Sequence, residues 1–579
     1  VSGRELPMHL GLPTRSVHGL PIIEHAEFGR NVPDEAMPDE DKMNLGKIYH
    51  MGKLESAELI LNRQAMASHT FITGSTGTGK SNAVYHLLDE ITKNGQTTFL
   101  VVEPAKGEYK NVFGNCTDVQ VFGTNPRETP LLRMNPFAFP ENIHILEHID
   151  RLVEIFNACW PMYAAMPAVL KDAIERSYQK VGWDLRNSES EKGVFPTFFD
   201  LLDILPGVIE ESHYSKDTQS DYVGALCTRV KSLTNGIYGS VLCAEDALSD
   251  AEMFDQNVIV DLSRVGSMET KSLLMGILVM KLQEYRMCSS GMNSRLRHVT
   301  VLEEAHNLLR KTSAEQSQEG ANLQGKSVEM LANAIAEMRT YGEGFIIADQ
   351  APGLLDMSVI RNTNTKIILR LPDEEDRKLV GKSAALKEAQ IDELSKLPLG
   401  VAAVYQNEWP EAVLCKIEAY PMPENAVYHK PSKMPHEINA EFVFGQLAVG
   451  KELEPLSSSE MEQLKLWLKR HEMMLKPEDG RYLERVFAGG ELDVAKTRKA
   501  VFDFFGGIGT VVDYCAAAKK SLTPRKEFLE QLQGQYGLKA AAADWVLNSV
   551  ISMGMSLNPD AKAVDNLRTN FEQQGGRVL

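Results

Sequence analysis

The sequence predicts an α/β protein whose parallel sheet is covered by helices on both faces, and two observations support this class. Short runs of β-branched and other apolar residues alternate with stretches of helical spacing from residue 70 onward. These runs are continuously apolar, as expected for strands that are buried on both faces. The 579 residues are 43% hydrophobic and 24% charged, a globular composition that excludes a mostly disordered chain.

The expected elements follow in chain order. A strand at 70–73 leads into a helix at 81–93. Further strands are expected at 97–102, 257–262, 298–302, 344–348 and 366–371, and edge strands at 401–405 and 412–417. The polar stretch 312–326 has almost no apolar residue, so it is expected to be a loop.

Five parts are expected along the chain. A remnant, barrel-like β module in residues 1–65 precedes a core whose first half is 66–140 and whose second half is 251–429. A helical insertion, 141–250, separates the two halves, and a helical module fills 430–579, with helices such as 458–476 and 523–536. Charge distinguishes this last module. It holds 20 basic and 20 acidic residues, so residues 1–429 carry the whole net charge of −18.

Composition also bears on location and on metals. The longest apolar run, 272–280, is shorter than the ~18 residues that a membrane span needs. The chain starts at Val1 with neither an initiator Met nor a signal peptide, so we expect that its first residues are missing. The seven cysteines are scattered without metal-ligand spacing. These features predict a cytoplasmic protein with reduced thiols, no zinc site and no membrane contact.

The most specific motif is G-x-x-x-x-G-K-[ST] at 74–81, between an expected strand and an expected helix. Its glycines allow backbone N–H groups to surround a phosphate, and the helix adds its positive N-terminal field. Lys80 is expected to reach the β- and γ-phosphates of ATP, and the Ser81 hydroxyl to bind Mg²⁺. The alternative is a glycine-rich turn before a helix. The candidate nucleotide-binding residues are Gly74, Ser75, Thr76, Gly77, Thr78, Gly79, Lys80, Ser81 and Asn82.

Two adjacent carboxylates, Glu303 and Glu304, follow the expected strand 298–302. A phosphate-binding loop of this kind needs one carboxylate for Mg²⁺ and one for the attacking water. We expect Glu303 to serve the metal and Glu304 the water, although the pair could simply begin a solvated loop. His306 either orients Glu304 or caps the next helix.

Further candidates come from the next strands. Gln350 closes the strand at 344–348, and ligands of such sheets bind at the carboxyl ends of strands, so it is expected near the γ-phosphate or the water. A satisfied turn residue is the alternative for Gln350. Arg339 and Arg370, and more weakly Arg361, could neutralise developing charge within one subunit or from a neighbour. Each arginine could also be an ordinary surface residue.

Seven stretches together resemble the HerA/FtsK group of ring-forming ATPases, specifically HerA-like proteins. They are HTFITGSTGTGKSN (69–82), VVEPAKGEY (101–109), RMNPF (133–137), NVIVDLS (257–263), VLEEAH (301–306), EMRTYGEGFIIADQAPG (337–353) and NTKIILRL (364–371). The resemblance extends over residues 50–420 and implies a RecA-like P-loop NTPase core.

The resemblance also implies a function. It implies a homo-hexamer with ATP between subunits, translocation of double-stranded DNA, and Arg339 as the arginine that serves the neighbouring site. Relatives work with a partner nuclease in DNA end processing, or are encoded beside a nuclease or sirtuin-like effector in antiphage defence. The chain departs from the pattern at Glu103, where many relatives have Asp, and in its helical tail.

Two other functions remain open. The ring could be an ATP-dependent scaffold that assembles and activates an effector enzyme with little translocation of DNA. The sparse basic residues near the polar loop, Arg310, Lys311 and Lys326, motivate this alternative. A conjugation-type secretion ATPase is the third possibility, but it would usually need the membrane anchor that the sequence lacks.

Overall fold

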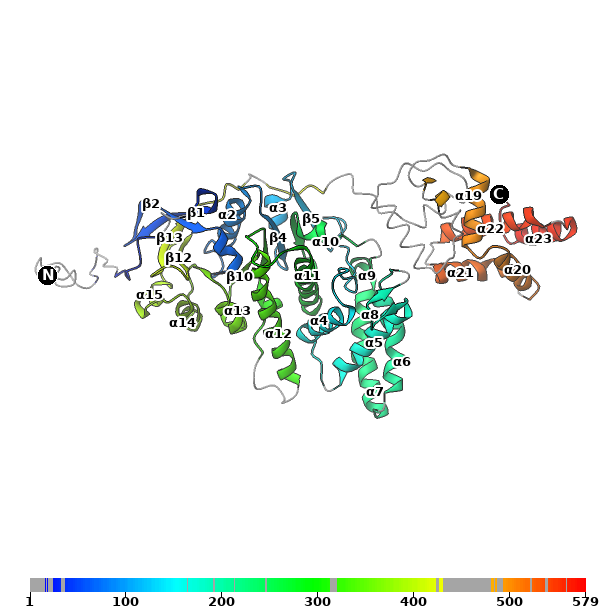
Figure 1. Ribbon diagram of the computed structural model, residues 1–579, viewed down its shortest axis with the longest axis horizontal. Coiled ribbons are helices and arrows are strands. Elements are labelled where there is room, and N and C mark those ends of the chain that lie inside the picture. The colour runs from blue at the N-terminus through cyan, green and yellow to red at the C-terminus, as the bar shows by residue number, and fades with distance from the viewer. Residues whose placement is uncertain are drawn as a thin grey trace, which may run out of the picture. The chain divides into compact units, whose positions relative to one another are not determined.

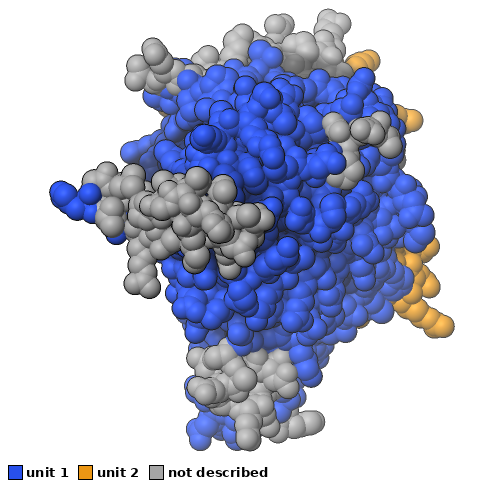
Figure 2. Space-filling view, turned by 90° about the vertical axis from the view of Figure 1, so that its left-hand side faces the viewer, with its two compact units in different colours: residues 1–177, 197–430 blue, residues 178–196, 431–579 orange. Residues whose placement is uncertain are grey.

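The structure is a computed structural model that forms two compact units. Unit 1 comprises residues 1–177 and 197–430, and unit 2 comprises residues 178–196 and 431–579, drawn in blue and orange in Figure 2. The described residues are 16, 18, 24–32, 37–163, 165–190, 193–212, 214–244, 247–312, 320–422, 426–430, 481–483, 485–486, 493–520, 523–536, 540–558 and 560–578.

Unit 1 is built on an 11-stranded sheet with the order β2-β1-β13-β12-β11-β3-β10-β9-β4-β8-β5 (Figure 1). Seven neighbouring strands, from β11 to β5, are parallel. They are β11 (Thr365–Ile368), β3 (Thr70–Thr73), β10 (Glu343–Asp349), β9 (His298–Glu303), β4 (Thr98–Glu103), β8 (Asn257–Asp261) and β5 (Val119–Gly123). The predicted α/β class with a parallel sheet is confirmed. Of these seven strands, the analysis of the sequence missed β5.

The remaining strands extend this sheet in antiparallel fashion. They are β12 (Val401–Gln406), β13 (Val413–Ile417), β1 (Lys42–His50) and β2 (Lys53–Asn62). The prediction that 401–405 and 412–417 are edge strands is wrong, because the β1–β2 hairpin pairs with β13 and covers it. Much of the predicted β module at 1–65, including residues 1–15, lies outside the described residues.

Both faces of the parallel strands are covered. The helix α2 (Lys80–Thr92) packs one face through Val84, Leu87 and Leu88, against alternate strand residues such as Val301. The other face carries Glu343, which bonds to Arg286 of α11 (Met268–Ser289). This burial on two sides explains why the strands are continuously apolar.

The remaining helical elements of unit 1 connect and flank the strands. Between β5 and β8 lie α4 (Ile145–Cys159), α5 (Met166–Lys180), α6 (Phe198–Glu211), α7 (Lys216–Tyr222), η3 (Val223–Cys227), α8 (Thr228–Thr234), α9 (Gly236–Leu242) and α10 (Asp250–Phe254). Helix α5 extends past residue 177, where this segment of unit 1 ends. Elsewhere are η1 (Asp39–Asp41), η2 (Gln64–Ser68), α3 (Tyr109–Phe113), η4 (Ala305–Asn307), α12 (Gly320–Glu337), η5 (Met338–Tyr341), η6 (Pro352–Leu354), α13 (Met357–Arg361), α14 (Glu374–Ser383) and α15 (Glu388–Glu393).

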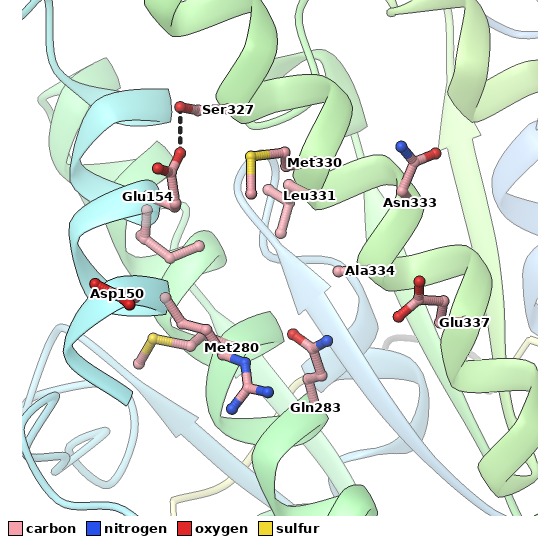
Figure 3. Close-up of a pocket in the computed structure, with 12 residues that line it drawn as sticks. Asp150, Glu154, Met280, Gln283, Ser327, Met330, Leu331, Asn333, Ala334 and Glu337 are labelled. Carbon is pink, nitrogen blue, oxygen red and sulfur yellow. Dashed lines mark hydrogen bonds between the residues drawn. The ribbon is translucent and has the colours of Figure 1, made fainter. Parts of the chain in front are cut away.

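Helices α4, α11 and α12 line a groove with a volume of about 360 Å³ (Figure 3). Met280 and Leu331 contribute apolar surface, while Glu154 accepts a hydrogen bond from the Ser327 hydroxyl across it. The polar segment 312–326 was predicted to be a loop, but residues 320–326 form the first turns of α12. Tertiary contact explains this difference, since Gln324 donates to the Ala158 carbonyl oxygen of α4 at 3.0 Å. Residues 313–319 lie outside the described part.

Unit 2 is mainly helical in its described residues. It contains a small hairpin, β6 (Trp183–Asp184) and β7 (Glu189–Ser190), and the helices α19 (Val494–Phe504), α20 (Gly507–Ala518), α21 (Pro524–Tyr536), α22 (Ala540–Leu557) and α23 (Ala561–Gln573). The helix expected at 523–536 is therefore confirmed, whereas the one expected at 458–476 lies outside the described residues. A separate apolar core, which includes Phe502, Tyr514 and Phe571, holds these helices together.

Candidate active site

The glycine-rich loop 74–79 connects β3 to α2 at the carboxyl edge of the sheet. Gly77 (φ 75°) and Gly79 (φ 106°) have left-handed backbone angles that other residues adopt only with strain. Around Gly77, a Cβ atom would meet no other heavy atom within 4 Å, so the outer side of the loop is open. The backbone N–H of Thr78 donates to Ser75 O at 3.2 Å, closing the loop on itself.

Neighbouring strands anchor this loop from behind. The Ser75 backbone N–H donates to Arg370 O at 3.0 Å, just beyond β11, and the Gly400 N–H donates to Thr78 O at 3.0 Å. At Gly74, a Cβ would lie 2.7 Å from both Leu369 Cβ and Thr78 Oγ1, so a larger residue has no room there. The loop is thus rigidly placed at the start of α2.

Four adjacent parallel strands end in a carboxyl group: β10 in Asp349, β9 in Glu303, β4 in Glu103 and β8 in Asp261. Because parallel strands end at the same edge, these groups form a row beside the glycine-rich loop. Glu304, which directly follows β9, adds a fifth carboxyl group. The sequence does not show which of these carboxyl groups are neighbours, because the order of the strands along the sheet differs from their order in the chain.

Lys80 brings together the two glutamates predicted from the sequence. Its Nζ lies 3.3 Å from Glu303 Oε2 and 3.1 Å from Glu304 Oε1. Adjacent strand residues normally point to opposite faces. The Glu304 side chain lies on the same side as that of Glu303 because the Glu304 backbone is left-handed (φ 43°, ψ 51°). This conformation costs a non-glycine residue about 1–2 kcal/mol. Burial alone would lower the pKa of Lys80, but the charges of the two glutamates raise it, so the amine stays protonated.

Gln350 connects Glu304 to the glycine-rich loop. Its Nε2 donates to Glu304 Oε1 at 2.6 Å, and its Oε1 accepts from the Thr76 hydroxyl at 2.7 Å. The structure therefore places Gln350 next to Lys80, Glu304 and the loop, as the position of strand β10 suggested.

The sequence left two possible roles for His306, orienting Glu304 or capping the next helix. Its Nδ1 lies 2.9 Å from Asp349 Oδ2 and 3.6 Å from Glu304 Oε2, while its backbone N–H donates to the same Asp349 oxygen at 2.8 Å. The hydrogen bond to Asp349 raises the pKa of His306 despite its partial burial. His306 thus ties the residues after β9 to the end of β10.

The stretch from the end of β4 to the start of α3 contributes Tyr109, which reasoning from the sequence missed. Tyr109 donates its hydroxyl to Glu303 Oε1 at 2.5 Å. Burial and the Glu303 carboxylate raise the pKa of Tyr109 well above its ordinary value, so its hydroxyl remains a donor. Glu103 accepts the backbone N–H groups of Glu108 (2.8 Å) and Tyr109 (3.1 Å). A tyrosine six residues beyond a strand's carboxyl end was the signal available in the sequence.

Two further acids in this row differ in their partners. Burial raises the pKa of Glu103 to about 8 against the effect of those two N–H donors, and the nearby Asp261 and Glu303 carboxylates add to the rise. Asp261 is instead paired with Lys110, whose Nζ lies 2.6 Å from its Oδ2 and 2.9 Å from Glu128 Oε2. The centre of the row therefore has more carboxyl groups than cations.

The three candidate arginines lie at opposite edges of the sheet. Arg370 follows β11 at the carboxyl edge, where its carbonyl oxygen contacts the glycine-rich loop. Arg339, in η5, precedes β10, and Arg361, at the end of α13, precedes β11, so both lie at the amino edge. All three side chains are exposed. The seven residues of β10 span about 20 Å at ~3.3 Å per residue, so Arg339 is too distant to reach the loop of its own subunit.

The remaining candidates, Ser81 and Asn82, lie in the first turn of α2. Asn82 donates to Glu418 O at 3.0 Å and accepts from the Tyr420 N–H at 2.9 Å, so its side chain anchors the segment after β13. The Ser81 hydroxyl and the Glu303 carboxylate are oxygen donors, the ligand type that Mg²⁺ prefers. The open loop, Lys80 and these oxygens suit a magnesium-bound nucleoside triphosphate.

A phosphate-binding loop on a parallel sheet, with acids and a glutamine on the adjacent strands, defines a P-loop ATPase. Residues 43–281 match the family model described as the helicase HerA, central domain. This part of the chain is therefore similar to the central domain of HerA, as the sequence motifs suggested.

Curated relatives agree with this assignment. The chain is 23% identical over 436 residues to the probable helicase MJECL08 of Methanocaldococcus jannaschii, covering 69% of this chain and 76% of that protein. It is 26% identical over 387 residues to the DNA double-strand break repair helicase HerA of Sulfolobus acidocaldarius, covering 64% and 69%. The solved structure of VirB4 of Thermoanaerobacter pseudethanolicus has the same fold, with a TM-score of 0.50, 19% identity, and coverage of 66% of this chain and 98% of that chain.

Within the described residues, no single helix is both long enough and apolar enough to cross a membrane. Residues 495–504 and 507–518, a pair bent by 68°, meet the length and composition of a span only when taken together.

Proposed function

We propose that this HerA-like ATPase is a homo-hexameric motor that hydrolyses ATP to move double-stranded DNA. The observation that carries the ATP-hydrolysing part is the contact of Lys80 with both Glu303 and Glu304 beside an open, rigidly anchored glycine-rich loop. In this proposal, loop N–H groups of residues 74–82 and Lys80 bind the phosphates, and Glu304 accepts the proton of the attacking water.

The other site residues have supporting roles in the proposal. Ser81 and Glu303 would hold Mg²⁺, which neutralises charge on the phosphates when bound. Gln350 would orient the water, because its amide already bonds to Glu304 and to Thr76 of the loop. His306 Nδ1 lies 3.6 Å from Glu304 Oε2, and the left-handed Glu304 backbone holds its carboxylate on the side of Lys80.

The hexamer is supported by the position of Arg339. Its side chain is exposed at the sheet edge opposite to the loop of its own subunit, which suits an arginine that serves a neighbour. Mixing Arg339→Ala and Lys80→Ala subunits tests this role. Neither variant alone should hydrolyse ATP, but mixed rings should regain activity where an intact Lys80 site meets an intact Arg339. If only Arg370→Ala is inactive and cannot be complemented, the arginine acts within one subunit instead.

Contact with DNA is supported by cations at the two ends of the segment after η4. Lys311 and Lys326 are exposed, and their neighbours Thr312 and Gly325 lie together, since a Cβ on Gly325 would be 2.5 Å from Thr312 Oγ1. The two lysines therefore stand close to each other beyond the carboxyl end of β9. In a hexamer, with Arg310, they would form a ring of cations able to hold a phosphate backbone.

The DNA motor predicts that DNA stimulates ATP turnover and that Lys311→Glu with Lys326→Glu abolishes this stimulation. The measurements are ATP turnover with and without duplex DNA, and duplex binding as a function of salt. The matched control exchanges two exposed lysines elsewhere in unit 1, Lys53→Glu and Lys396→Glu, with the same change of net charge. Unchanged DNA binding in the Lys311/Lys326 variant would contradict the proposed contact.

A partner nuclease or sirtuin-like effector, in antiphage defence or in DNA end processing, completes the proposal. Unit 2 is a candidate docking module, because it has its own core and is not needed to build the ATPase sheet. The scaffold function remains the second candidate, favoured by the small number of cations near Lys311. If the double lysine variant loses DNA binding but still activates the effector, the ring is a scaffold. If it loses both, the motor is supported.

A further inference from the structure

Glu303 is held at both of its carboxylate oxygens by two different elements. Oε2 lies 3.3 Å from Lys80 Nζ of α2, and Oε1 accepts the Tyr109 hydroxyl of α3 at 2.5 Å. Tyr109 is only 2% exposed, so this hydrogen bond is shielded from water. A side chain with two fixed oxygens has little freedom to rotate away from the site.

The backbone of the segment between β4 and α3 fixes Tyr109 in turn. Its N–H donates to Glu103 Oε2 at 3.1 Å, so the acid at the end of β4 anchors the residue that contacts the acid at the end of β9. Gly107 has φ 70°, and a Cβ there would lie 2.9 Å from Ser263 Oγ, beyond the end of β8. The segment is therefore confined against three adjacent strands.

The Tyr109 ring is held as firmly as its backbone. It packs edge-on against Tyr85 of α2, with ring centroids 4.9 Å apart and an angle of 81° between the planes. Since Lys80 begins the same helix, the phosphate-binding helix and the carboxylate at the end of β9 share one aromatic contact. A move of Glu303 relative to Lys80 would have to break the hydroxyl bond or this packing.

We propose that Tyr109 is a positioning residue that orients Glu303 for the binding of the magnesium-bound nucleotide. This inference rests on the proposed role of Glu303 as the metal-binding carboxylate. Partners that hold metal ligands in place typically contribute 10- to 100-fold to metal affinity, roughly the scale expected here. The hydroxyl acts by restricting Glu303 and has no contact with the nucleotide in this proposal.

The test is Tyr109→Phe, which keeps the ring and removes the hydroxyl. We expect the Mg²⁺ concentration for half-maximal ATP turnover to rise about tenfold or more. Turnover at saturating Mg²⁺ should recover to within a few-fold of the wild type, and binding of a fluorescent ATP analogue in EDTA should not change. Tyr85→Phe is the matched control, because it removes a hydroxyl from the same aromatic pair without touching Glu303.

A double-mutant cycle that combines Tyr109→Phe with Glu303→Gln distinguishes the positioning of Glu303 from a general effect on folding. If Tyr109 acts through Glu303, adding Tyr109→Phe to Glu303→Gln should not weaken Mg²⁺-dependent nucleotide binding further. Equal Mg²⁺ requirements in the wild type and Tyr109→Phe would overturn the inference, as would the same loss in the Glu303→Gln background. By contrast, a wild type that binds no nucleotide with or without Mg²⁺ would overturn the proposed function itself.

Discussion

Strands β9 and β10 carry a buried cluster of charged residues at each end, and the two clusters are built differently. At the carboxyl ends, Glu303, Glu304 and Asp349 gather around Lys80 and His306. At the amino ends, Glu343 accepts from Arg286 Nε at 2.8 Å and from the Thr300 hydroxyl at 2.8 Å, with His298 Nδ1 also 2.8 Å away.

In the cluster at the amino ends, the charged groups of Arg286 and Glu343 are bonded to protein partners. Arg286 and Glu343 are 0% exposed, and Arg286 also bonds to Asp255 Oδ1 at 2.8 Å and to the Phe254 carbonyl oxygen. Although burial favours a protonated carboxyl group, His298 and Arg286 lower the pKa of Glu343 to about 2. Each of the three guanidinium nitrogens of Arg286 therefore has a protein partner, as a buried charge in a structural network requires, whereas His298 Nε2 has none among the described residues.

The cluster at the carboxyl ends has an excess of carboxyl groups, a left-handed glutamate and an open loop beside it. These features weaken the fold locally and suit a cation and a phosphate chain. Burial and charge alone therefore do not distinguish the candidate functional cluster from a structural one. The incomplete neutralisation and the strained backbone distinguish it from the structural one.

The largest expected effect is on folding, from Arg286→Ala at the amino-end cluster. This substitution removes the guanidinium group that pairs with the buried Glu343 carboxylate. The free energy of unfolding, measured by urea denaturation, should therefore fall by about 3–5 kcal/mol. The control is Arg176→Ala, which removes an arginine that is also bound to two acids, Asp172 and Glu211, but at the surface. Its effect should stay within about 1 kcal/mol. Similar losses in the two variants would remove the distinction between the clusters.

Next in size is the effect of Lys80→Ala at the other end of the strands. Turnover of ATP should fall by about 100- to 1000-fold, because the proposed function assigns to Lys80 the cation that stabilises the transferred phosphoryl group. The urea midpoint should change less than in Arg286→Ala, since the local fold does not depend on complete neutralisation there. Steady-state ATPase assays and urea titrations measure both quantities. Normal turnover in Lys80→Ala would show that the carboxyl-end cluster is not the active site.

A third expected effect is an opposite response to pH of Glu343, in the amino-end cluster, and of Glu103, at the carboxyl end of the neighbouring strand β4. The pKa of Glu343 is about 2 in the folded protein and ordinarily 4.5. Glu343 therefore stabilises the fold at pH values above 4.5, and this stabilisation is lost as the pH falls from 4.5 towards 2. With a pKa of about 8, Glu103 contributes stability that is present below 4.5 and lost as the pH rises from 4.5 to 8. Its share of the slope is at most about 1.4 kcal/mol per pH unit.

Urea denaturation between pH 5 and 8 checks this response. The wild type should lose stability with rising pH relative to Glu103→Gln, which cannot titrate. Glu329→Gln, a change at an exposed position of α12, serves as the control and should keep the wild-type slope. Parallel pH profiles of the wild type and Glu103→Gln would contradict a protonated Glu103 at neutral pH.

Patterns within the sequence were enough to predict the α/β class, most of the parallel strands, the glycine-rich loop and the acids at strand ends. These features are local, because strand periodicity, loop glycines and the residue that closes a strand are all read within one segment of chain. Since parallel strands all end at one edge, the polarity of the strands was enough to predict that Glu303, Glu304 and Gln350 lie at the same edge of the sheet as the glycine-rich loop.

The tertiary structure alone decided which groups touch and which strands are covered. The left-handed turn at Glu304, the Tyr109 hydroxyl on Glu303 and the β1–β2 hairpin on β13 all join segments that lie apart in the chain or depend on what packs around them. It also put Arg339 and Arg370 at opposite edges. The physical reason is that sheet order and the packing of distant segments are set by burial of the whole core, which no local pattern encodes.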